Sequence, residues 1–300
     1  MINWGKISTD ISVATRTHFV FNKVTQLAGG DSNQAWRLSG ITEPGNDHGE
    51  IHYMVKLNAA DKEIMFAAES AGLAAMGATQ TIRVPRTITH GVTEQHSFLV
   101  LEYCNLVLHG DSSLLGTQLA AIHQVHAAQF GWHQDNTIGV TPQPNNWSSD
   151  WLNFWREQRL GFQLELAAQN GYLSALQKLG KQVLDALPDL LADHHPQPSL
   201  LHGDLWSGNH GFLADGTPVL FDPATYYGDR EADIAMTELF GGYAPEFYAA
   251  YQQAYPLNAG YSKRKNLYNL YHILNHCNMV SSSYVAQAER IMRGLLGKIK

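Results

Sequence analysis

The chain has 300 residues, of which 44% are hydrophobic and only 16% are charged, and its formal net charge is −7. This length allows two domains and a large buried core, so the fold needs no disulfide or metal to hold it together. The acidic balance argues against a nucleic-acid binder, which would carry a basic footprint. No stretch approaches the ~20 apolar residues that span a membrane. With two cysteines, Cys104 and Cys277, and no signal-peptide core, we expect a cytoplasmic protein with reduced thiols.

The first third of the chain predicts a β-rich unit. Apolar residues alternate between turn signals at 19–27, 34–38, 51–57, 87–92 and 97–103, which predicts five strands. A helix is expected at 60–77. One face of the third strand carries Ile51, Tyr53, Val55 and Leu57. Lys56 therefore points to the opposite face of that strand.

After Asn105 the pattern becomes helical. Helices are expected at 111–128, 148–170 and 173–187, with a long loop at 131–147. Trp147, Trp151 and Trp155 are four residues apart, which predicts one shared helix face, in the core rather than as a substrate wall. The chain is expected to form an N-terminal lobe at 1–104, a hinge near 102–105 and a C-terminal lobe at 105–300. A junction between lobes is a preferred place for a ligand site.

The most informative segment is LLHGDLWSGNHGF at 200–212, which places His202, Asp204 and Asn209 in the pattern H-x-D-x4-N. Asp222 follows at the end of another apolar run, 13 residues after Asn209. This arrangement is typical of kinases. One aspartate accepts a proton from the attacking hydroxyl, while the asparagine and the second aspartate hold Mg²⁺ on the ATP phosphates. Turns are rich in Asp and Asn, but chance seldom produces this combination of spacings.

A lysine in a predicted strand supports the same interpretation. Lys56 lies in the run YMVKL, and Glu69 lies in a helical row with Met65, Leu73 and Met76. Each charge is costly among apolar residues unless it is paired. The kinase strand lysine binds the α- and β-phosphates and pairs with a helix glutamate. The alternative is two solvated surface charges.

Two further segments are candidate nucleotide contacts. A turn between the first two strands could lay backbone N–H groups over phosphates, although an ordinary hairpin turn explains it equally well; it consists of Gly29, Gly30, Asp31, Ser32 and Asn33. The end of the fifth strand enters the expected hinge, where backbone groups would bind adenine; these belong to Glu102, Tyr103 and Cys104.

The differences from protein kinases are informative too. Gly203 replaces the arginine of H-R-D, and Trp206 stands at the position of the catalytic-loop lysine. The second motif is Asp222-Pro223-Ala224 instead of D-F-G, and no A-P-E follows. The arginine that reads a phosphorylated activation loop is therefore missing. The sequence indicates a small-molecule kinase.

Four segments resemble the fructosamine/ketosamine-3-kinase family across nearly the whole chain: HGDLWSGN (202–209), FDPATYYGDREADIAM (221–236), NTIGVTPQPN (136–145) and GGDSNQAWRL (29–38). The resemblance implies an α+β, bilobal, protein-kinase-like fold shared with aminoglycoside and choline kinases. It also implies ATP-dependent phosphorylation of the sugar 3-hydroxyl of a ketoamine, on a small molecule or a glycated protein. The unstable product then falls apart, which is deglycation. Some members carry a redox-sensitive cysteine in the Gly-rich loop, but this chain has none there.

The same resemblance implies roles for individual residues. Asp204 is the catalytic base, and Asn209 and Asp222 are the Mg²⁺ ligands. His202 and Asp233 support the catalytic loop, with a surface acid as the alternative for Asp233. Trp206 could stack on the sugar, or it could be a core residue.

Other interpretations stay open. The substrate could be an aminoglycoside or a choline-like alcohol, and a nucleotide-binding pseudokinase is a further alternative, although the complete set of motif residues argues against it. His272 and His276, followed by Cys277, have a spacing that can bind a metal, but no further ligand lies nearby in sequence, so packing or solvated histidines are expected. His123, His126, His194 and His195 receive the same interpretation. The oligomeric state is not determined.

Overall fold

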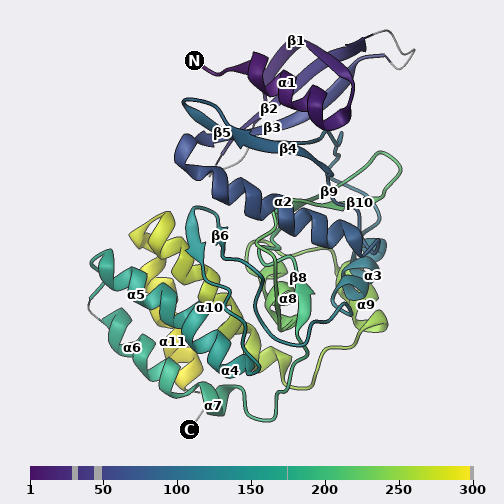
Figure 1. Cartoon of the computed structure of the whole chain (residues 1–300). Coiled ribbons are helices and arrows are strands. Elements are labelled where there is room, and N and C mark those ends of the chain that lie inside the picture. The colour runs from purple at the N-terminus through teal and green to yellow at the C-terminus, as the bar shows by residue number, and fades with distance from the viewer. Residues whose placement is uncertain (29–32, 44–48, 174, 298–300) are drawn as a thin grey trace. The chain divides into compact units, whose positions relative to one another are not determined.

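The computed structural model describes residues 1–28, 33–43, 49–173 and 175–297 (Figure 1). The chain divides into two compact units. The first contains Met1–Gly110 and Gly211–Phe221, and the second contains Asp111–His210 and Asp222–Lys300. The division falls after Gly110 rather than after residue 104, and it adds residues 211–221 to the first unit. Among the described residues, no helix has the length and apolar character to cross a membrane.

The first unit is built on a five-stranded antiparallel sheet with the order β1-β2-β3-β5-β4. Its elements are α1 (Trp4–Thr15), β1 (His18–Gln26), β2 (Gln34–Glu43), β3 (Ile51–Ala59), η1 (Ala60–Lys62), α2 (Glu63–Ala78), β4 (Thr87–Val92), β5 (His96–Glu102), most of β9 (His210–Phe212) and β10 (Pro218–Leu220). The five predicted strands and the helix at 60–77 are confirmed, although β2 runs five residues further than predicted.

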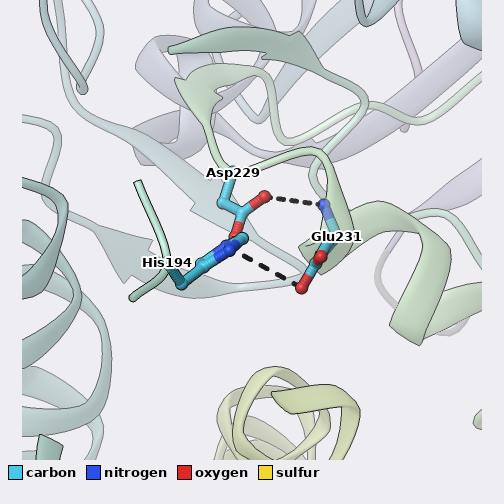
Figure 2. Close-up of side chains that lie close together, drawn as sticks. All are labelled: His194, Asp229 and Glu231. Atoms are coloured by element: carbon cyan, nitrogen blue, oxygen red, sulfur yellow. Dashed lines mark hydrogen bonds and ion pairs between the residues drawn. The ribbon is translucent and has the colours of Figure 1, made fainter. Parts of the chain in front are cut away.

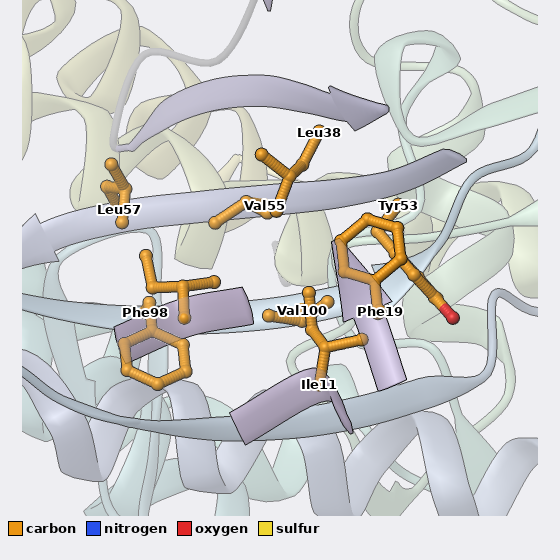
Figure 3. Close-up of a cluster of buried hydrophobic side chains, with 9 residues drawn as sticks. Ile11, Phe19, Leu38, Tyr53, Val55, Leu57, Phe98 and Val100 are labelled. Carbon is orange, nitrogen blue, oxygen red and sulfur yellow. The ribbon is translucent and has the colours of Figure 1, made fainter. Parts of the chain in front are cut away.

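One face of the sheet forms the core of the first unit, as Figure 3 shows. The side chains in this core include Phe19, Leu38, Tyr53, Val55, Leu57, Phe98 and Val100. The predicted alternation along β3 is confirmed, since Tyr53, Val55 and Leu57 lie in this cluster and Ile51 packs against it. The opposite face therefore carries Lys56, which is where α2 approaches the sheet.

Helix α1 covers the core face and was not predicted. Its first turn is capped by Asn3, whose side chain accepts a hydrogen bond from the Lys6 N–H at 3.0 Å. Ile7 and Ile11, one turn apart, are fully buried against the sheet. A capping asparagine followed by two apolar residues at helical spacing is a signal that could have identified the helix.

The second unit is mainly helical. Its elements are α3 (Ser112–Ile122), β6 (Asn136–Ile138), β7 (Thr141–Gln143), α4 (Trp151–Phe154), the π-helical segment η2 (Trp155–Gly161), α5 (Phe162–Gln169), α6 (Ala175–Asp185), α7 (Leu187–Leu190), β8 (Ser199–Leu201), η3 (Ser207–Asn209), β11 (Tyr226–Gly228), α8 (Glu231–Thr237), α9 (Pro245–Ala254), α10 (Tyr261–Met279), η4 (Ser282–Tyr284) and α11 (Val285–Leu296). The segment at 131–147 contains the short hairpin β6–β7, so the prediction of a long loop without regular structure was wrong.

The helix predicted at 111–128 ends at Ile122, six residues early. The chain leaves the helix to pair with β8. The carbonyl of Val125 accepts the Leu200 N–H at 2.8 Å, and His126 bridges Ser199. Strand pairing with a segment some 70 residues away competes with continued helix here, and only the fold reveals it.

The helix predicted at 148–170 begins at Trp151, because the Asp150 side chain caps it by accepting the Asn153 N–H at 2.9 Å. Trp151 and Trp155 are buried core residues, as predicted. Trp147 precedes the helix, is 45% exposed and stacks on Tyr227. The expectation that all three tryptophans share one helix face was therefore wrong for Trp147.

Candidate active site

In the first unit, Lys56 and Glu69 form a buried ion pair. The Lys56 Nζ lies 2.5 Å from a Glu69 carboxylate oxygen, and the two side chains are only 4% and 10% exposed. Lys56 lies on the central strand β3, opposite Ala35 on β2 and Leu99 on β5. The interpretation as two solvated surface charges is therefore wrong. Buried charges of this kind are costly, so the pair points to a requirement beyond stability.

The Gly-rich turn falls mostly outside the described residues, which exclude Gly29, Gly30, Asp31 and Ser32. Its last member, Asn33, accepts a hydrogen bond from the Asn58 side chain at 2.8 Å. This bond ties the start of β2 to β3, two residues beyond Lys56.

The hydrogen bonds at the end of β5 determine which groups of the expected hinge segment are available to a ligand. The Glu102 N–H donates to the Arg86 carbonyl at 2.8 Å, and the Glu102 carboxylate pairs with Arg83. That N–H is therefore already used within the first unit. Tyr103 and Cys104 follow the strand, and burial raises the pKa of the Cys104 thiol, with a further increase from the Glu102 charge. Cys104 is thus a poor nucleophile.

In the second unit, the predicted catalytic loop follows β8 and is anchored through its backbone. The carbonyl of His202 accepts the Ala224 N–H at 2.9 Å. Gly203 has a φ of +85°, and a Cβ there would lie 2.1 Å from the Ala224 carbonyl oxygen. Only glycine fits this close approach, which explains why the arginine of protein kinases is absent.

Asp233 anchors the catalytic loop by hydrogen bonds to the loop's backbone. Its two carboxylate oxygens accept the N–H groups of His202 at 2.7 Å and Gly203 at 2.9 Å. Burial alone would raise the pKa of Asp233, but a hydrogen bond from His123 and neighbouring charges outweigh burial and lower it. Asp233 is 1% exposed, so the interpretation as a surface acid is wrong.

Asp204 lies among other acidic groups. The pKa of Asp204 is raised to about 7, mainly by burial and secondly by the nearby charge of Asp222. A hydrogen bond from Asn209 opposes this shift. The Asn209 side-chain nitrogen donates to the Asp204 carbonyl at 2.8 Å and to its carboxylate at 3.2 Å. Asp222 adopts a left-handed backbone, with a φ of +59°, a conformation that aspartate tolerates better than most residues. The three residues predicted from the motif therefore lie close together.

Trp206 lies on the surface of the second unit. It is 36% exposed, so the interpretation as a buried core residue is wrong. Its ring meets Phe240 edge-on at 6.5 Å, and its carbonyl accepts the Tyr243 hydroxyl at 3.0 Å. The backbone of Trp206 is thus fixed, while its side chain stays partly exposed.

His272 and His276 form no metal site with a third ligand among the residues that the structure describes. The His276 Nδ1 donates to the His272 carbonyl at 2.8 Å. The pKa of His272 is lowered to about 3, mainly by burial and secondly by the neighbouring His276, so the His272 ring is neutral. His276 packs on Phe240 with ring centroids 4.9 Å apart, in line with a packing role.

A second set of buried charges, which the motifs did not reveal, lies beside β11 (Figure 2). The His194 Nε2 lies 2.5 Å from Asp229, and Arg264 donates two hydrogen bonds of 2.7 Å to Glu231. Tyr268 also donates to Asp229. Because these carboxylate oxygens already have partners, the cluster is better suited to holding α8 and α10 together than to binding a metal.

We expect Glu231→Gln to lower the free energy of unfolding by about 3–5 kcal/mol, because it leaves the Arg264 charge buried without its bidentate partner. Glu289→Gln is the matched control, since the partly exposed pair of Glu289 with Arg293, one turn apart on α11, contributes about 0.5 kcal/mol. Urea unfolding of both variants measures the difference. Equal stability of the two variants would contradict a structural role for the buried cluster.

Comparisons with known proteins agree with this geometry. The model of one protein family, described as fructosamine kinase, matches residues 3–298 of this chain. A protein of Synechocystis sp. described as a probable ketoamine kinase is 47% identical over 296 residues, covering 98% of this chain and 97% of its own. A chloroplastic protein-ribulosamine 3-kinase of Arabidopsis thaliana is 39% identical over 282 residues, covering 93% of this chain and 84% of its own.

Solved structures give the same result for the fold. A crystal structure of a protein described as a fructosamine-3-kinase, from Haemophilus somnus 129PT, has a TM-score of 0.87 and 31% identity, and covers 98% of this chain and 97% of its own. An ADP-bound aminoglycoside phosphotransferase has a TM-score of 0.62 at 11% identity, with 96% of each chain covered. The predicted α+β, protein-kinase-like fold is therefore confirmed.

Proposed function

Because this chain belongs to the fructosamine kinase family, we propose that it transfers the γ-phosphate of ATP to the 3-hydroxyl of the sugar of a ketoamine. The observation that carries the proposal is the grouping of Asp204, Asn209 and Asp222 around one loop of the second unit. The names of relatives over almost the whole chain support the ketoamine substrate. Phosphorylation makes the ketoamine unstable, so the outcome is deglycation of an amine or of a protein lysine.

Asp204 acts as the base in this proposal. A general base works best when its pKa lies near the operating pH, and burial moves the pKa of Asp204 upward in that direction. The carboxylate accepts the proton of the sugar hydroxyl as the oxygen attacks the γ-phosphorus, and the bond from that phosphorus to ADP breaks as ADP leaves. Asn209 fixes the Asp204 carboxylate by donating to it, which leaves the Asn209 side-chain oxygen for another partner.

Asn209 and Asp222 fit the role of Mg²⁺ ligands. Mg²⁺ prefers oxygen ligands, and an amide oxygen beside carboxylates supplies them. The charge of Asp222 raises the pKa of Asp204, which reflects a local excess of negative charge that a cation would relieve. The bound ion supplies charge neutralisation for the ATP phosphates.

The first unit supplies the nucleotide contacts in this proposal. Lys56, held by Glu69, binds ATP phosphate oxygens. Backbone groups of residues 102–104 bind the adenine. The Glu102 N–H is not among these groups, because it already donates to the Arg86 carbonyl. A cytoplasmic location fits the two free cysteines, Cys104 and Cys277.

The acceptor sugar contacts Trp206, two residues from the base. We expect Trp206→Ala to raise KM for the ketoamine about tenfold, on the order of 1–1.5 kcal/mol of lost aromatic contact, with little change in KM for ATP. The buried Trp155 offers the contrast, because Trp155→Ala should lower the melting temperature without selectivity for either substrate. Both KM values and the melting temperature of each variant decide the point. A fall in stability alone for Trp206→Ala would contradict the sugar contact.

The direct test is a substrate panel with purified protein, ATP and Mg²⁺. Fructosamines, ribulosamines, a glycated protein, an aminoglycoside and choline are compared by ADP production, and the product is located by NMR. Phosphate on the sugar 3-hydroxyl supports the proposal. Turnover of only the aminoglycoside or choline would replace the substrate but keep the chemistry, and nucleotide binding without any turnover would indicate a pseudokinase.

A further inference from the structure

His123 lies at the end of α3, far in sequence from every motif of the proposed site. It is fully buried. Its Nε2 lies 3.1 Å from Asp233, on the same carboxylate oxygen that accepts the His202 N–H. Its Nδ1 lies 2.8 Å from the Tyr251 hydroxyl. The ring therefore connects the support of the catalytic loop to helix α9.

The donors and acceptors of this network are complementary. The Asp233 carboxylate can only accept, so the His123 Nε2 must carry a hydrogen. The Tyr251 oxygen already accepts from the Arg230 guanidinium at 3.1 Å, which directs its own hydrogen toward the His123 Nδ1. The hydrogen bonds run in sequence from Arg230 through Tyr251 and His123 to Asp233.

The position of Asp233 sets that of the loop. Its two oxygens bind consecutive backbone N–H groups, those of His202 and Gly203, and Asp204 is the next residue. Each oxygen has one backbone donor, and His123 adds a third hydrogen bond, to the oxygen that binds His202, which further restricts rotation of the carboxylate. A rotation at Asp233 would move Asp204 relative to the hydroxyl that it deprotonates, and displacements of about 1 Å can cost 10²-fold in rate.

We propose that His123 is a positioning residue for phosphoryl transfer, acting by orienting Asp233 so that the Asp204 loop is held in its reactive geometry. This inference rests on the proposed function for its kinetic consequence, but the orientation of the loop can be measured without it. A buried histidine that only fills space would contribute packing and stability alone. The two roles differ in what a substitution that retains one hydrogen bond should do.

The test compares two amides at position 123. In His123→Gln the side-chain nitrogen reaches about as far as Nε2, so the donor to Asp233 is kept. In His123→Asn the side-chain oxygen takes the place of Nδ1 and accepts the Tyr251 hydroxyl, so the Tyr251 side is kept and the donor to Asp233 is lost. We expect His123→Asn to lower kcat about 10- to 100-fold with KM for ATP within about twofold, and His123→Gln to retain most of kcat.

The control for stability is Leu115→Ala, which removes a buried side chain two turns earlier on α3. It should lower the melting temperature while leaving kcat near that of the wild type, when all proteins are assayed well below their melting temperatures. If His123→Asn behaves like Leu115→Ala, or if His123→Gln is as slow as His123→Asn, the positioning role is wrong.

Backbone hydrogen exchange of the full chain provides the readout that is independent of substrate. The N–H groups of His202 and Gly203 should exchange faster in His123→Asn and at the wild-type rate in His123→Gln. Unchanged exchange in His123→Asn would overturn the proposal. If the wild type phosphorylates no ketoamine but the exchange pattern is as expected, the proposed function fails while the orienting role of His123 stands.

Discussion

Asp204→Asn is expected to lower kcat by about 10²–10⁴-fold, the usual contribution of a positioned base. The asparagine keeps the shape of the side chain but cannot accept the proton of the sugar hydroxyl. The Asn209 hydrogen bonds to the Asp204 carbonyl and side chain have acceptors in the variant as well, so the loop should keep its structure. Steady-state kinetics with a ketoamine substrate measures the effect, and calorimetric titration should show ATP affinity little changed.

A matched control is Asp215→Asn, in the turn between β9 and β10. Asp215 is fully exposed and bonds only to Thr217 among the contacts that the structure describes, so its loss should leave kcat unchanged. Near-normal turnover by Asp204→Asn would remove Asp204 from the role of base. A large loss in both variants would indicate a general effect of charge rather than proton transfer.

Asp222→Ala is expected to abolish productive binding of Mg²⁺–ATP. The site then loses its anionic ligand, and the remaining amide of Asn209 is neutral. A metal ion on the phosphates contributes several kcal/mol to the transition state, which corresponds to about 10²–10⁴-fold in turnover. Turnover measured across a range of Mg²⁺ and Mn²⁺ concentrations should be restored only in part at high metal.

Asp222→Asn separates charge from backbone conformation. Position 222 has a positive φ, which asparagine tolerates better than alanine does. If both variants lose activity equally, the carboxylate charge is the cause. If Asp222→Asn keeps the wild-type dependence on Mg²⁺, Asp222 is a structural residue and the proposed metal ligand is wrong.

The sequence was sufficient where the signal is local. Alternation along β3 placed Tyr53, Val55 and Leu57 on one face, and it placed Lys56 on the other, because strand periodicity needs no knowledge of distant residues. The pairing of Lys56 with Glu69 followed from the cost of burying either charge alone. The H-x-D-x4-N spacing is also a local signal, and the predicted neighbours Asp204 and Asn209 are hydrogen-bonded to each other.

The sequence was insufficient where the partner is distant. His123 meets Asp233 across 110 residues, and Arg264 meets Glu231 across 33, so neither pair has a local pattern. The early end of α3 depends on pairing with β8, which apolar spacing cannot reveal. The error at Trp147 was avoidable, since Asp150 is a strong helix-capping residue that marks a later start.

The placement of α1 over the sheet has a consequence for how the protein can be trimmed. Arg16, immediately after the helix, has a left-handed backbone and offers a cleavage point for trypsin-like proteases. Loss of the residues before it would remove Ile7 and Ile11 from the sheet and expose Phe19, Leu38 and Val100. An uncovered apolar sheet face promotes self-association. Fusion partners and shortened forms of this enzyme should therefore leave the first 16 residues intact, even though these residues contain none of the motif residues.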